Sequence, residues 1–152
     1  MSSLEDQLDR IDRNILAALA GNGRLSMAEL GLKVGLSKTP VQARVKRLER
    51  DGFIRGYAAI VDRERMGEGH VAFVQVKLSD TRSAALDAFN RAALAIPEIE
   101  QCHMIASSFD YLLKVRTRDI ASYRRVLGEK ISAMPHVAQT STYVGMETVK
   151  DR

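Results

Sequence analysis

The sequence predicts an α+β protein of two small domains, a cluster of three helices followed by a βαββαβ unit. Two observations carry this prediction. Apolar residues recur at helical spacing through the first third of the chain, whereas β-branched segments alternate with helical ones from His70 onward. The 152 residues, 45% of them apolar, are enough for one or two domains of about 100–200 residues each.

The first two helices are marked by their ends. The first spans residues 8–20 and is stopped by a Gly-Asn-Gly sequence. Ser26 and Glu29 form a capping-box pattern, in which each side chain accepts a hydrogen bond from the other residue's backbone N–H. This pattern opens a second helix that ends at Gly35. The apolar face of the first helix consists of Leu8, Ile11, Ile15 and Leu19.

A third helix follows after the very short connection Leu36-Ser37 and runs to about Arg50. Ser37 is a plausible N-cap, and Pro40 is acceptable in the first turn because no intrahelical hydrogen bond is lost there. Two short helices joined by a glycine-containing turn, after a longer helix, form a helix-turn-helix arrangement. The apolar face of the third helix consists of Val41, Val45 and Leu48.

The stretch Phe53–Val61 is β-prone and predicts a wing strand that leads into a linker. The stretch Asp62–Gly69 is charged and contains glycine, which is typical of a domain boundary. We therefore predict a winged helix-turn-helix domain over residues 1–62, with its wing or linker strand from about residue 53. A second domain is predicted over residues 63–152.

The second domain has the order βαββαβ, which is that of the ferredoxin-like fold. The strands FVQVKL and YLLKV are apolar on both sides, which favours a homodimer that buries the sheet face opposite the helices. A monomer with a modestly apolar open face is the alternative. Strands are predicted at residues 71–78, 99–106, 111–117 and 137–149, and helices at residues 83–96 and 120–134.

The positive charge of the chain is concentrated in one stretch. The window from Lys33 to Arg55 holds seven basic and two acidic residues, so it carries +5, and the rest of the chain carries −1. A local basic stripe is typical of nucleic-acid binding, because phosphate contacts supply most of the sequence-independent affinity. An ordinary three-helix bundle with a basic, solvated face is the alternative. The capped helices, the tight turn and the charge together favour double-stranded DNA.

The third helix is therefore the predicted DNA-reading element. The N-terminal part of such a helix meets base edges in the major groove, so Lys38, Thr39 and Gln42 are predicted to read bases. Arg47 and Arg50 lie further along the helix and suit phosphates. The complete predicted DNA-binding set is Ser37, Lys38, Thr39, Gln42, Arg44, Lys46, Arg47 and Arg50.

Other classes of function find little support in the sequence. The single cysteine, Cys102, allows no disulfide within one chain, and no apolar run approaches the ~18 residues of a membrane span. The N-terminus lacks the apolar segment of a secretory signal, so we expect a cytoplasmic protein with no membrane partner. The three histidines lie far apart, and no phosphate-binding or serine-hydrolase motif is present. We predict no enzyme activity, no catalytic residue, no metal and no cofactor.

Over nearly its whole length the chain resembles the Lrp/AsnC transcriptional regulators, or feast/famine proteins. The resemblance is carried by LDRIDRNIL, VGLSKTPVQARVKRLERDGFIRGY, QCHMIASSFDYLLKVRTRDI and TSTYVGMETVK, in this order. It implies an N-terminal winged helix-turn-helix and a C-terminal ferredoxin-like domain that senses an effector and forms oligomers. It also implies dimers that commonly assemble into octamers and bind a small amino acid between subunits.

The resemblance also carries over effector-response positions, residue by residue. Met104 and Asp110 fall on such positions, as do Ile120 at a helix start and Tyr143–Gly145 on the last strand. A carboxylate near a strand turn suits the ammonium of a zwitterion, and Met104 and Ile120 suit contacts with its side chain. The full effector set that we predict is Met104, Ala106, Ser107, Ser108, Asp110, Ile120, Tyr143, Val144 and Gly145.

Two departures from the family pattern bear on the identity of the effector. Members close to the leucine-responsive protein usually have Gly-Asp where this chain has Ser107-Ser108, and a bulkier residue at Gly145. These differences remove a charge and change the volume of the pocket, so they argue against leucine. The stretches ASSFDYLLKVRT and YRRVLGEKIS are similar to the proteobacterial subgroup that activates proline catabolism, which favours proline or another small apolar amino acid.

We therefore predict a sequence-specific DNA-binding transcriptional regulator of amino-acid metabolism. Its DNA binding would be modulated by a small amino acid bound at subunit interfaces, with proline as the first candidate. Two alternatives stay open. One is a global, nucleoid-organising regulator with weak sequence specificity, and the other is an amino-acid-binding or catalytic module that does not read DNA.

Overall fold

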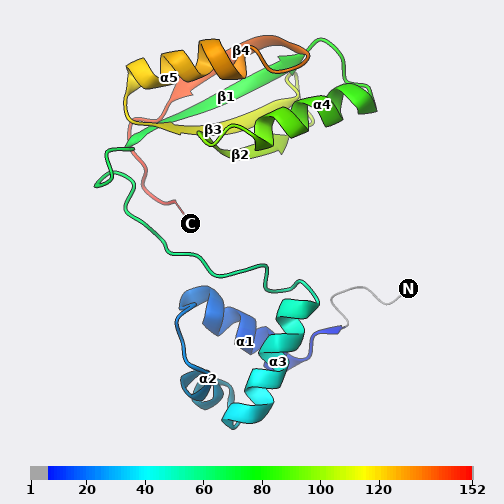
Figure 1. Cartoon of the computed structure of the whole chain (residues 1–152), viewed down its shortest axis with the longest axis vertical. Coiled ribbons are helices and arrows are strands. Elements are labelled where there is room, and N and C mark those ends of the chain that lie inside the picture. The colour runs from blue at the N-terminus through cyan, green and yellow to red at the C-terminus, as the bar shows by residue number, and fades with distance from the viewer. Residues whose placement is uncertain (1–6, 152) are drawn as a thin grey trace. The chain divides into compact units, whose positions relative to one another are not determined.

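The computed structural model describes residues 7–151 and divides the chain into two compact units, Met1–Ile60 and Val61–Arg152 (Figure 1). The N-terminal unit contains three helices, and the C-terminal unit contains a four-stranded sheet with helices. The predicted α+β class is confirmed.

Helix α1, Arg10–Gly21, begins two residues later than expected, because Asp9 caps it. The Asp9 side chain accepts a hydrogen bond from the backbone N–H of Asp12, and Asp12 accepts one in return from Asp9. Two orphan N–H groups at the helix start are thereby satisfied. The sequence prediction placed no cap here.

Helix α2, Met27–Val34, has the predicted capping box between Ser26 and Glu29. The turn after it requires glycine at two positions. Gly35 has a φ of 75°, and a Cβ on Gly31 would lie 2.5 Å from the Leu36 carbonyl oxygen. The connection to the next helix can be this short only because both residues lack a side chain.

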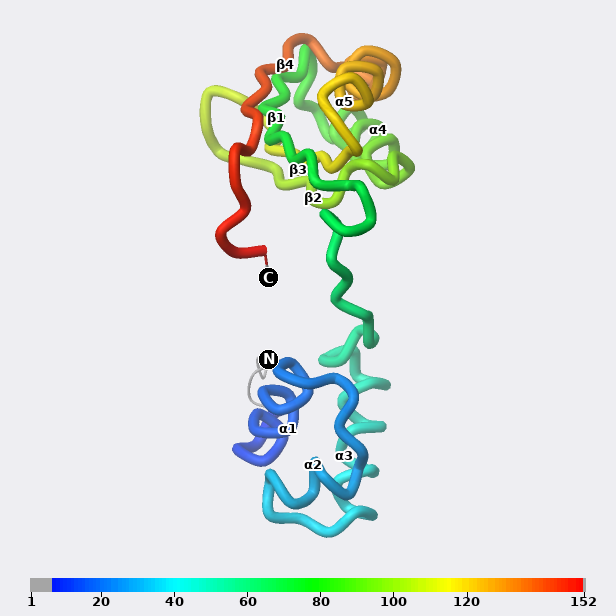
Figure 2. The backbone as a smooth tube through the Cα atoms, turned by 90° about the vertical axis from the view of Figure 1, so that its left-hand side faces the viewer, coloured from blue at the N-terminus to red at the C-terminus, as the bar shows by residue number. Residues whose placement is uncertain are grey.

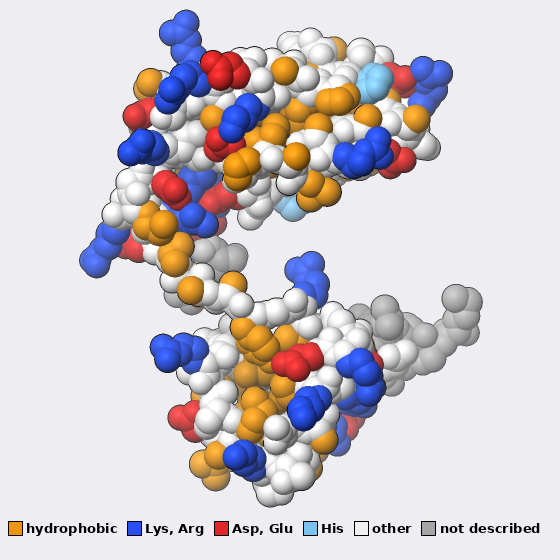
Figure 3. All heavy atoms as spheres, viewed as in Figure 1, with side chains coloured by type: hydrophobic (Ala, Val, Ile, Leu, Met, Phe, Trp, Pro, Cys, Tyr) orange, Lys and Arg blue, Asp and Glu red, His pale blue; other side chains and the backbone are white. Residues whose placement is uncertain are grey.

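Helix α3, Lys38–Arg50, has Ser37 at its N-cap position as predicted, but the Ser37 side chain makes no capping hydrogen bond. The core of the unit lies where α1, α2 and α3 meet, and Figure 3 shows hydrophobic side chains gathered there. The predicted apolar faces of all three helices supply it. The buried members are Ile15, Leu19, Leu30, Val41, Val45 and Leu48.

The strand predicted from Phe53 to Val61 does not form in this single chain. Phe53 and Ile54 pack against the helical core instead, and the residues from Tyr57 to Val61 are exposed. A β-strand needs a partner for its backbone hydrogen bonds, and no described segment pairs with this one. The predicted wing strand is therefore absent from the described residues, whereas the helix-turn-helix itself is confirmed.

The C-terminal unit has the predicted βαββαβ order. Its sheet has the strand order β2-β3-β1-β4, and each neighbouring pair is antiparallel. Helices α4 and α5 both lie on one side of the sheet in Figures 1 and 2, as in a ferredoxin-like fold. The elements are β1 His70–Leu78, α4 Ser83–Leu94, β2 Ile99–Met104, β3 Tyr111–Thr117, α5 Ile120–Val126, the π-helical turn η2 Leu127–Ile131 and β4 Val137–Val144.

Several boundaries differ from the prediction, among them that of α4, which ends at Leu94 instead of residue 96. Strand β2 ends at Met104, two residues early, because the chain turns into the loop before β3. The last helix changes to π geometry at Leu127, which apolar periodicity alone does not reveal. Strand β4 ends at Val144 rather than at residue 149. Beyond it, the chain reaches Asp151, whose carboxylate pairs with Lys114 on β3 at 2.5 Å.

The two faces of the sheet differ in character. The face under α4 and α5 forms the main core, with Val74 on β1 and Leu113 on β3 both fully buried. The opposite face is mixed, since Phe73 and Tyr143 are 37% and 54% exposed while Lys114 is buried among carboxylates. The prediction that these strands are apolar on both sides holds for β1 near Phe73. It is wrong for β3, where the buried Lys114 lies on the face opposite the helices.

Candidate DNA-binding and effector-binding sites

The predicted DNA-binding residues lie along one helix. Those expected to read bases, Lys38, Thr39 and Gln42, are exposed in the first two turns of α3. Lys46 is also exposed, one turn further along. The packing of α3 explains this, because Val41, Val45 and Leu48 occupy its buried face and leave the other positions outward. Figure 3 shows basic side chains over this unit.

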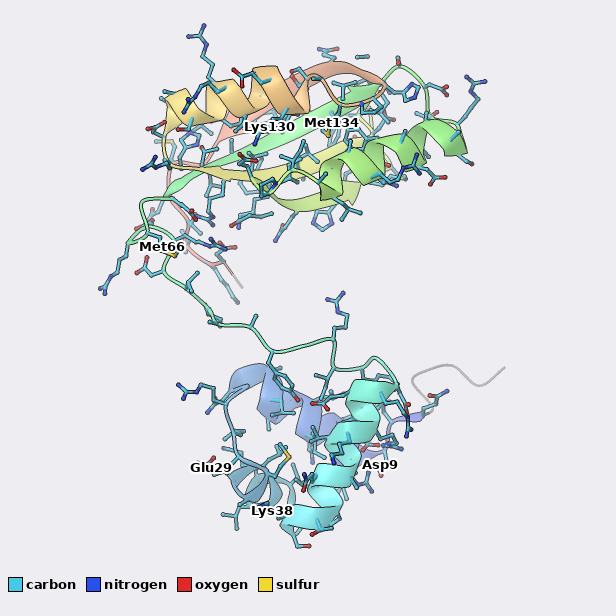
Figure 4. The ribbon with its side chains drawn as sticks, viewed as in Figure 1. Asp9, Glu29, Lys38, Met66, Lys130 and Met134 are labelled. Carbon is cyan, nitrogen blue, oxygen red and sulfur yellow. The ribbon has the colours of Figure 1, made fainter. Side chains whose placement is uncertain are left out.

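Two of the predicted arginines are held by acids of α1. The Arg44 guanidinium lies 2.6 Å from Asp9 Oδ2 and 2.8 Å from Asp12 Oδ1. Arg47 pairs with the second carboxylate oxygen of Asp12. Asp12 itself is buried, with 1% of its surface exposed. Figure 4 shows Asp9 beside α3, and Lys38 at the start of that helix.

The pKa values of these acids follow from the same contacts. Burial alone would raise the pKa of Asp12, but the hydrogen bonds from Arg44 and Arg47 outweigh it and lower that pKa. The backbone N–H of Asp12 and the Arg44 side chain lower the pKa of Asp9. Both carboxylates are therefore ionised at neutral pH, and the cluster of two acids and two arginines carries no net charge.

The cations of α3 thus fall into three groups, of which Arg44 and Arg47 form the first. Arg50 forms a surface ion pair with its neighbour Asp51 at 2.8 Å. Within residues 7–151, Lys38 and Lys46 form no ion pair. The sequence identified the basic stripe, but it did not reveal that Asp9 and Asp12 neutralise two of its arginines. Asp12 was the signal that could have revealed this pairing. It is a carboxylate on the apolar face of α1, three residues before Ile15, and a buried carboxylate needs a partner.

The predicted effector residues form two groups in the C-terminal unit. The first group surrounds the turn between β2 and β3. Met104 is 57% exposed at the end of β2, and the loop that follows contains Ala106, Ser107 and Ser108. The Asp110 carboxylate accepts a hydrogen bond from the Leu78 backbone N–H at 2.7 Å and lies 3.8 Å from Lys77 Nζ. One oxygen of Asp110 therefore already fixes the end of β1.

The second group lies near the start of β1. Ile120, the first residue of α5, is 58% exposed, and Tyr143 and Val144 are about half exposed at the end of β4. The Gly145 N–H donates to the Val71 carbonyl at 2.8 Å, and a Cβ on Gly145 would lie 3.2 Å from that oxygen. The absence of a side chain at Gly145 permits this close approach.

One chain does not bring the two groups together. Met104 is opposite Tyr111, which pairs with Val76, whereas Val144 pairs with Ala72. Met104 and Val144 are therefore separated by about 13 Å along the strands and about 14 Å across them, from standard strand spacings. A small amino acid cannot touch both of these residues within one chain, although the loop residue Ser108 lines a pocket with Ser141 of β4.

Two further observations on the described part of the chain concern membrane spans and metal binding. No helix among residues 7–151 is long and apolar enough to cross a membrane. No group of three or more His, Cys, Asp and Glu side chains in the same range is arranged to hold a metal ion.

Comparisons with known proteins agree with this architecture. The family model described as winged helix-turn-helix DNA-binding matches residues 8–55, and the Lrp/AsnC ligand binding domain matches residues 71–152. The chain is 56% identical over 146 residues to the proline dehydrogenase transcriptional activator of Rhizobium radiobacter, covering 96% of this chain and 94% of that protein.

Two more distant proteins extend the comparison. The leucine-responsive regulatory protein of Escherichia coli strain K12 is 46% identical over 143 residues, which is 94% of this chain and 87% of that protein. A transcriptional regulator from Neisseria meningitidis, solved in complex with L-methionine, superimposes with a TM-score of 0.87 at 29% identity. That comparison covers 95% of this chain and 93% of the other.

A helix-turn-helix joined to a ligand-binding domain defines the class of protein, a DNA-binding regulator that responds to a small molecule. The chain belongs to the Lrp/AsnC family, because the ligand-binding family model spans more than half of it and a relative is 56% identical. It is a DNA-binding transcriptional regulator modulated by an amino acid, as the sequence predicted. The relatives named above are regulators rather than enzymes.

Proposed function

We propose that this regulator controls a gene of proline metabolism and that proline is its effector. The observation that carries the DNA-binding half of the proposal is the exposed face of α3, where Lys38, Thr39 and Gln42 lie together on the first two turns. The 56% identical relative, named as an activator of proline dehydrogenase, supports the choice of proline.

The mechanism on DNA follows from the position of these side chains. Helix α3 enters the major groove, where Gln42 pairs with adenine and Lys38 with guanine, and Thr39 contacts either base. Lys46 and Arg50 face the phosphates, and Ser37 contacts the backbone at the start of the helix. In a homodimer two such helices lie about one helical turn of DNA apart, on an imperfect palindrome.

The effector is proposed to bind between subunits. The group around Met104 and Asp110 from one chain would face the group around Ile120 and Tyr143 from another, since Met104 and Val144 lie too far apart within one chain for a small amino acid to contact both. Asp110 would hold the effector's ammonium, and Met104 and Ile120 would contact its ring. We propose homodimers that assemble into octamers, with the effector at these junctions.

Effector and DNA binding must then be coupled in both directions. If proline changes the affinity for DNA, DNA changes the affinity for proline by the same factor. Because the effector is bound between chains, it acts by favouring one arrangement of subunits over another.

The test uses the full-length protein and DNA selected from a random pool. Fluorescence anisotropy measures the affinity for selected and random DNA, with and without proline, and with alanine and leucine as controls. We expect selected DNA to bind at least about 10³-fold more tightly than random DNA. We expect proline alone to change the affinity by about 5- to 150-fold.

Each other outcome rejects a part of the proposal. Equal affinity for selected and random DNA would favour a nucleoid-organising regulator. No DNA binding at all would leave an amino-acid-binding module. A response to alanine or leucine but not to proline would refute proline. Light scattering that finds only dimers with effector bound would refute the octamer.

A further inference from the structure

The buried carboxylate of Asp12 is unusual because it is shared between two helices. Asp12 belongs to α1, yet its two oxygens accept hydrogen bonds from Arg44 and Arg47 of α3. One of these oxygens also accepts from the Asp9 backbone N–H at 3.2 Å. With 1% of its surface exposed, Asp12 is the most buried acid among residues 7–60.

Opening this cluster is costly, whereas opening a surface ion pair is not. If Arg44 or Arg47 turned away to a phosphate, the buried Asp12 carboxylate would lose one of its two guanidinium partners, which is unfavourable. Arg50 and Asp51 are exposed and screened by water, so a phosphate competes easily for Arg50. The guanidinium groups of Arg44 and Arg47 therefore stay paired with Asp12, although both arginines belong to the DNA-reading helix.

We infer that Asp12 is a specificity-determining positioning residue, which withholds Arg44 and Arg47 from DNA phosphates. The inference rests on the proposed binding of DNA by α3. Phosphate contacts bind any sequence equally and release counterions, whereas base contacts discriminate. Two fewer phosphate contacts lower the affinity for random DNA, and so raise the share of the binding that depends on Lys38, Thr39 and Gln42.

The inference revises the role of two residues predicted to bind DNA. Arg44 and Arg47 act mainly within the protein, where they fix α3 against α1. The free cations Lys38 and Lys46, together with the exposed Arg50, then supply the phosphate and base contacts of this helix. The +5 stripe of the sequence is consequently weaker in the folded protein than its composition indicates.

The experiment measures the binding of random duplex DNA by Asp12→Asn over a range of salt concentrations. Asparagine keeps the shape of the side chain but removes the charge, so Arg47 loses its acidic partner and Arg44 keeps only the exposed Asp9. We expect the slope of log K against log salt to steepen by about 1 to 2, since each new phosphate contact adds about 0.9. We expect random DNA to bind about tenfold more tightly near 0.1 M salt, with a lower ratio of selected to random affinity.

Two further variants test the cause. Adding Arg44→Gln and Arg47→Gln to Asp12→Asn must abolish the gain, because the released arginines produce it. Asp51→Asn is the matched control, an Asp-to-Asn change beside another cation of α3, and we expect it to change the slope little. Circular dichroism establishes that each variant is folded.

A graded variant keeps the test decisive if Asp12→Asn does not fold. Asp9→Asn removes the second partner of Arg44 at an exposed N-cap, where asparagine caps as well as aspartate. We expect a smaller steepening of the slope, below about 1, from this variant. An unchanged or flatter slope in a folded Asp12→Asn or Asp9→Asn protein overturns the inference. Failure of the wild-type protein to bind any DNA would overturn the proposed function instead.

Discussion

The two units of this regulator build their sites in opposite ways. In the N-terminal unit, all the residues proposed to contact DNA lie on α3 or at its N-cap, and the fold of one chain is enough to present them. In the C-terminal unit, the proposed effector residues lie at two ends of a sheet, around Met104 and around Val144. The first site is local, whereas the second, as proposed, requires another chain.

This difference explains how the two activities can be coupled. A site on a single helix is formed whenever that helix is folded, so one chain can present its contacts to one half-site. A site divided between chains exists only in an assembled state, so its ligand stabilises that state. The amino acid therefore acts on the arrangement of the subunits, and DNA binding responds because the arrangement places the recognition helices.

The largest expected effect comes from a substitution that destabilises the N-terminal unit and leaves the C-terminal unit folded. Leu30 of α2 is fully buried in the core of the N-terminal unit, so Leu30→Ala leaves a cavity that costs about 2 to 5 kcal/mol. We expect the N-terminal unit to melt early and DNA binding to be lost, while proline still raises the melting temperature of the C-terminal unit. Differential scanning calorimetry with and without proline measures both. Loss of the proline response would show that the two sites are not separately built.

The second prediction distinguishes base reading from phosphate contact within α3. Gln42→Ala should cost about 1 to 3 kcal/mol on selected DNA and little on random DNA. Lys46→Ala should weaken binding to both DNAs equally and lower the salt slope by about 0.9. Both side chains are exposed, so neither change affects the core. Anisotropy titrations with the two DNAs measure these effects. The reverse pattern would assign phosphate contact to Gln42 and base reading to Lys46.

A third prediction concerns pH and the stability of the N-terminal unit. The pKa of Asp12 lies below its ordinary value of 3.8, so its ion pairs stabilise the fold above that pH and are lost as the pH falls through the lowered pKa. Asp12→Asn should reduce the free energy of unfolding by about 1 to 3 kcal/mol at pH 7. The difference from wild type should shrink below pH 3.8. Urea titrations at pH 7 and pH 3 measure it; a constant difference contradicts the assignment.

The sequence predicted those features that depend on local pattern. The capping box of Ser26 and Glu29 and the buried stripe of α3 are properties of a few neighbouring residues, and both are confirmed. The pairing of Asp12 with Arg44 joins residues 32 positions apart, so no local pattern contains it. The strand expected at Phe53–Val61 failed for the related reason that β-propensity supplies no partner.

The same limit applies to the candidate effector site. The family resemblance indicated which residues belong to it, but not that Asp110 already binds the backbone of Leu78 or that the set divides into two groups. Both facts depend on strand register, which is fixed by the assembled sheet. The candidate residues and a site between subunits thus followed from the resemblance, whereas the contacts of Asp110 and the division of the set into two groups did not.

One measurement tests most directly whether the effector site is divided between chains. Met104→Asp alters one group and Ile120→Asp the other, by the same substitution at two residues exposed to nearly the same degree. Each variant alone should lose proline binding, because each places a carboxylate against the apolar part of the ligand. The two variants are then unfolded, mixed and refolded together, and proline binding is measured by calorimetry. Recovery of binding in the mixture is predicted, because some junctions then combine two intact groups; binding no better than in the separate variants would contradict a site shared between chains.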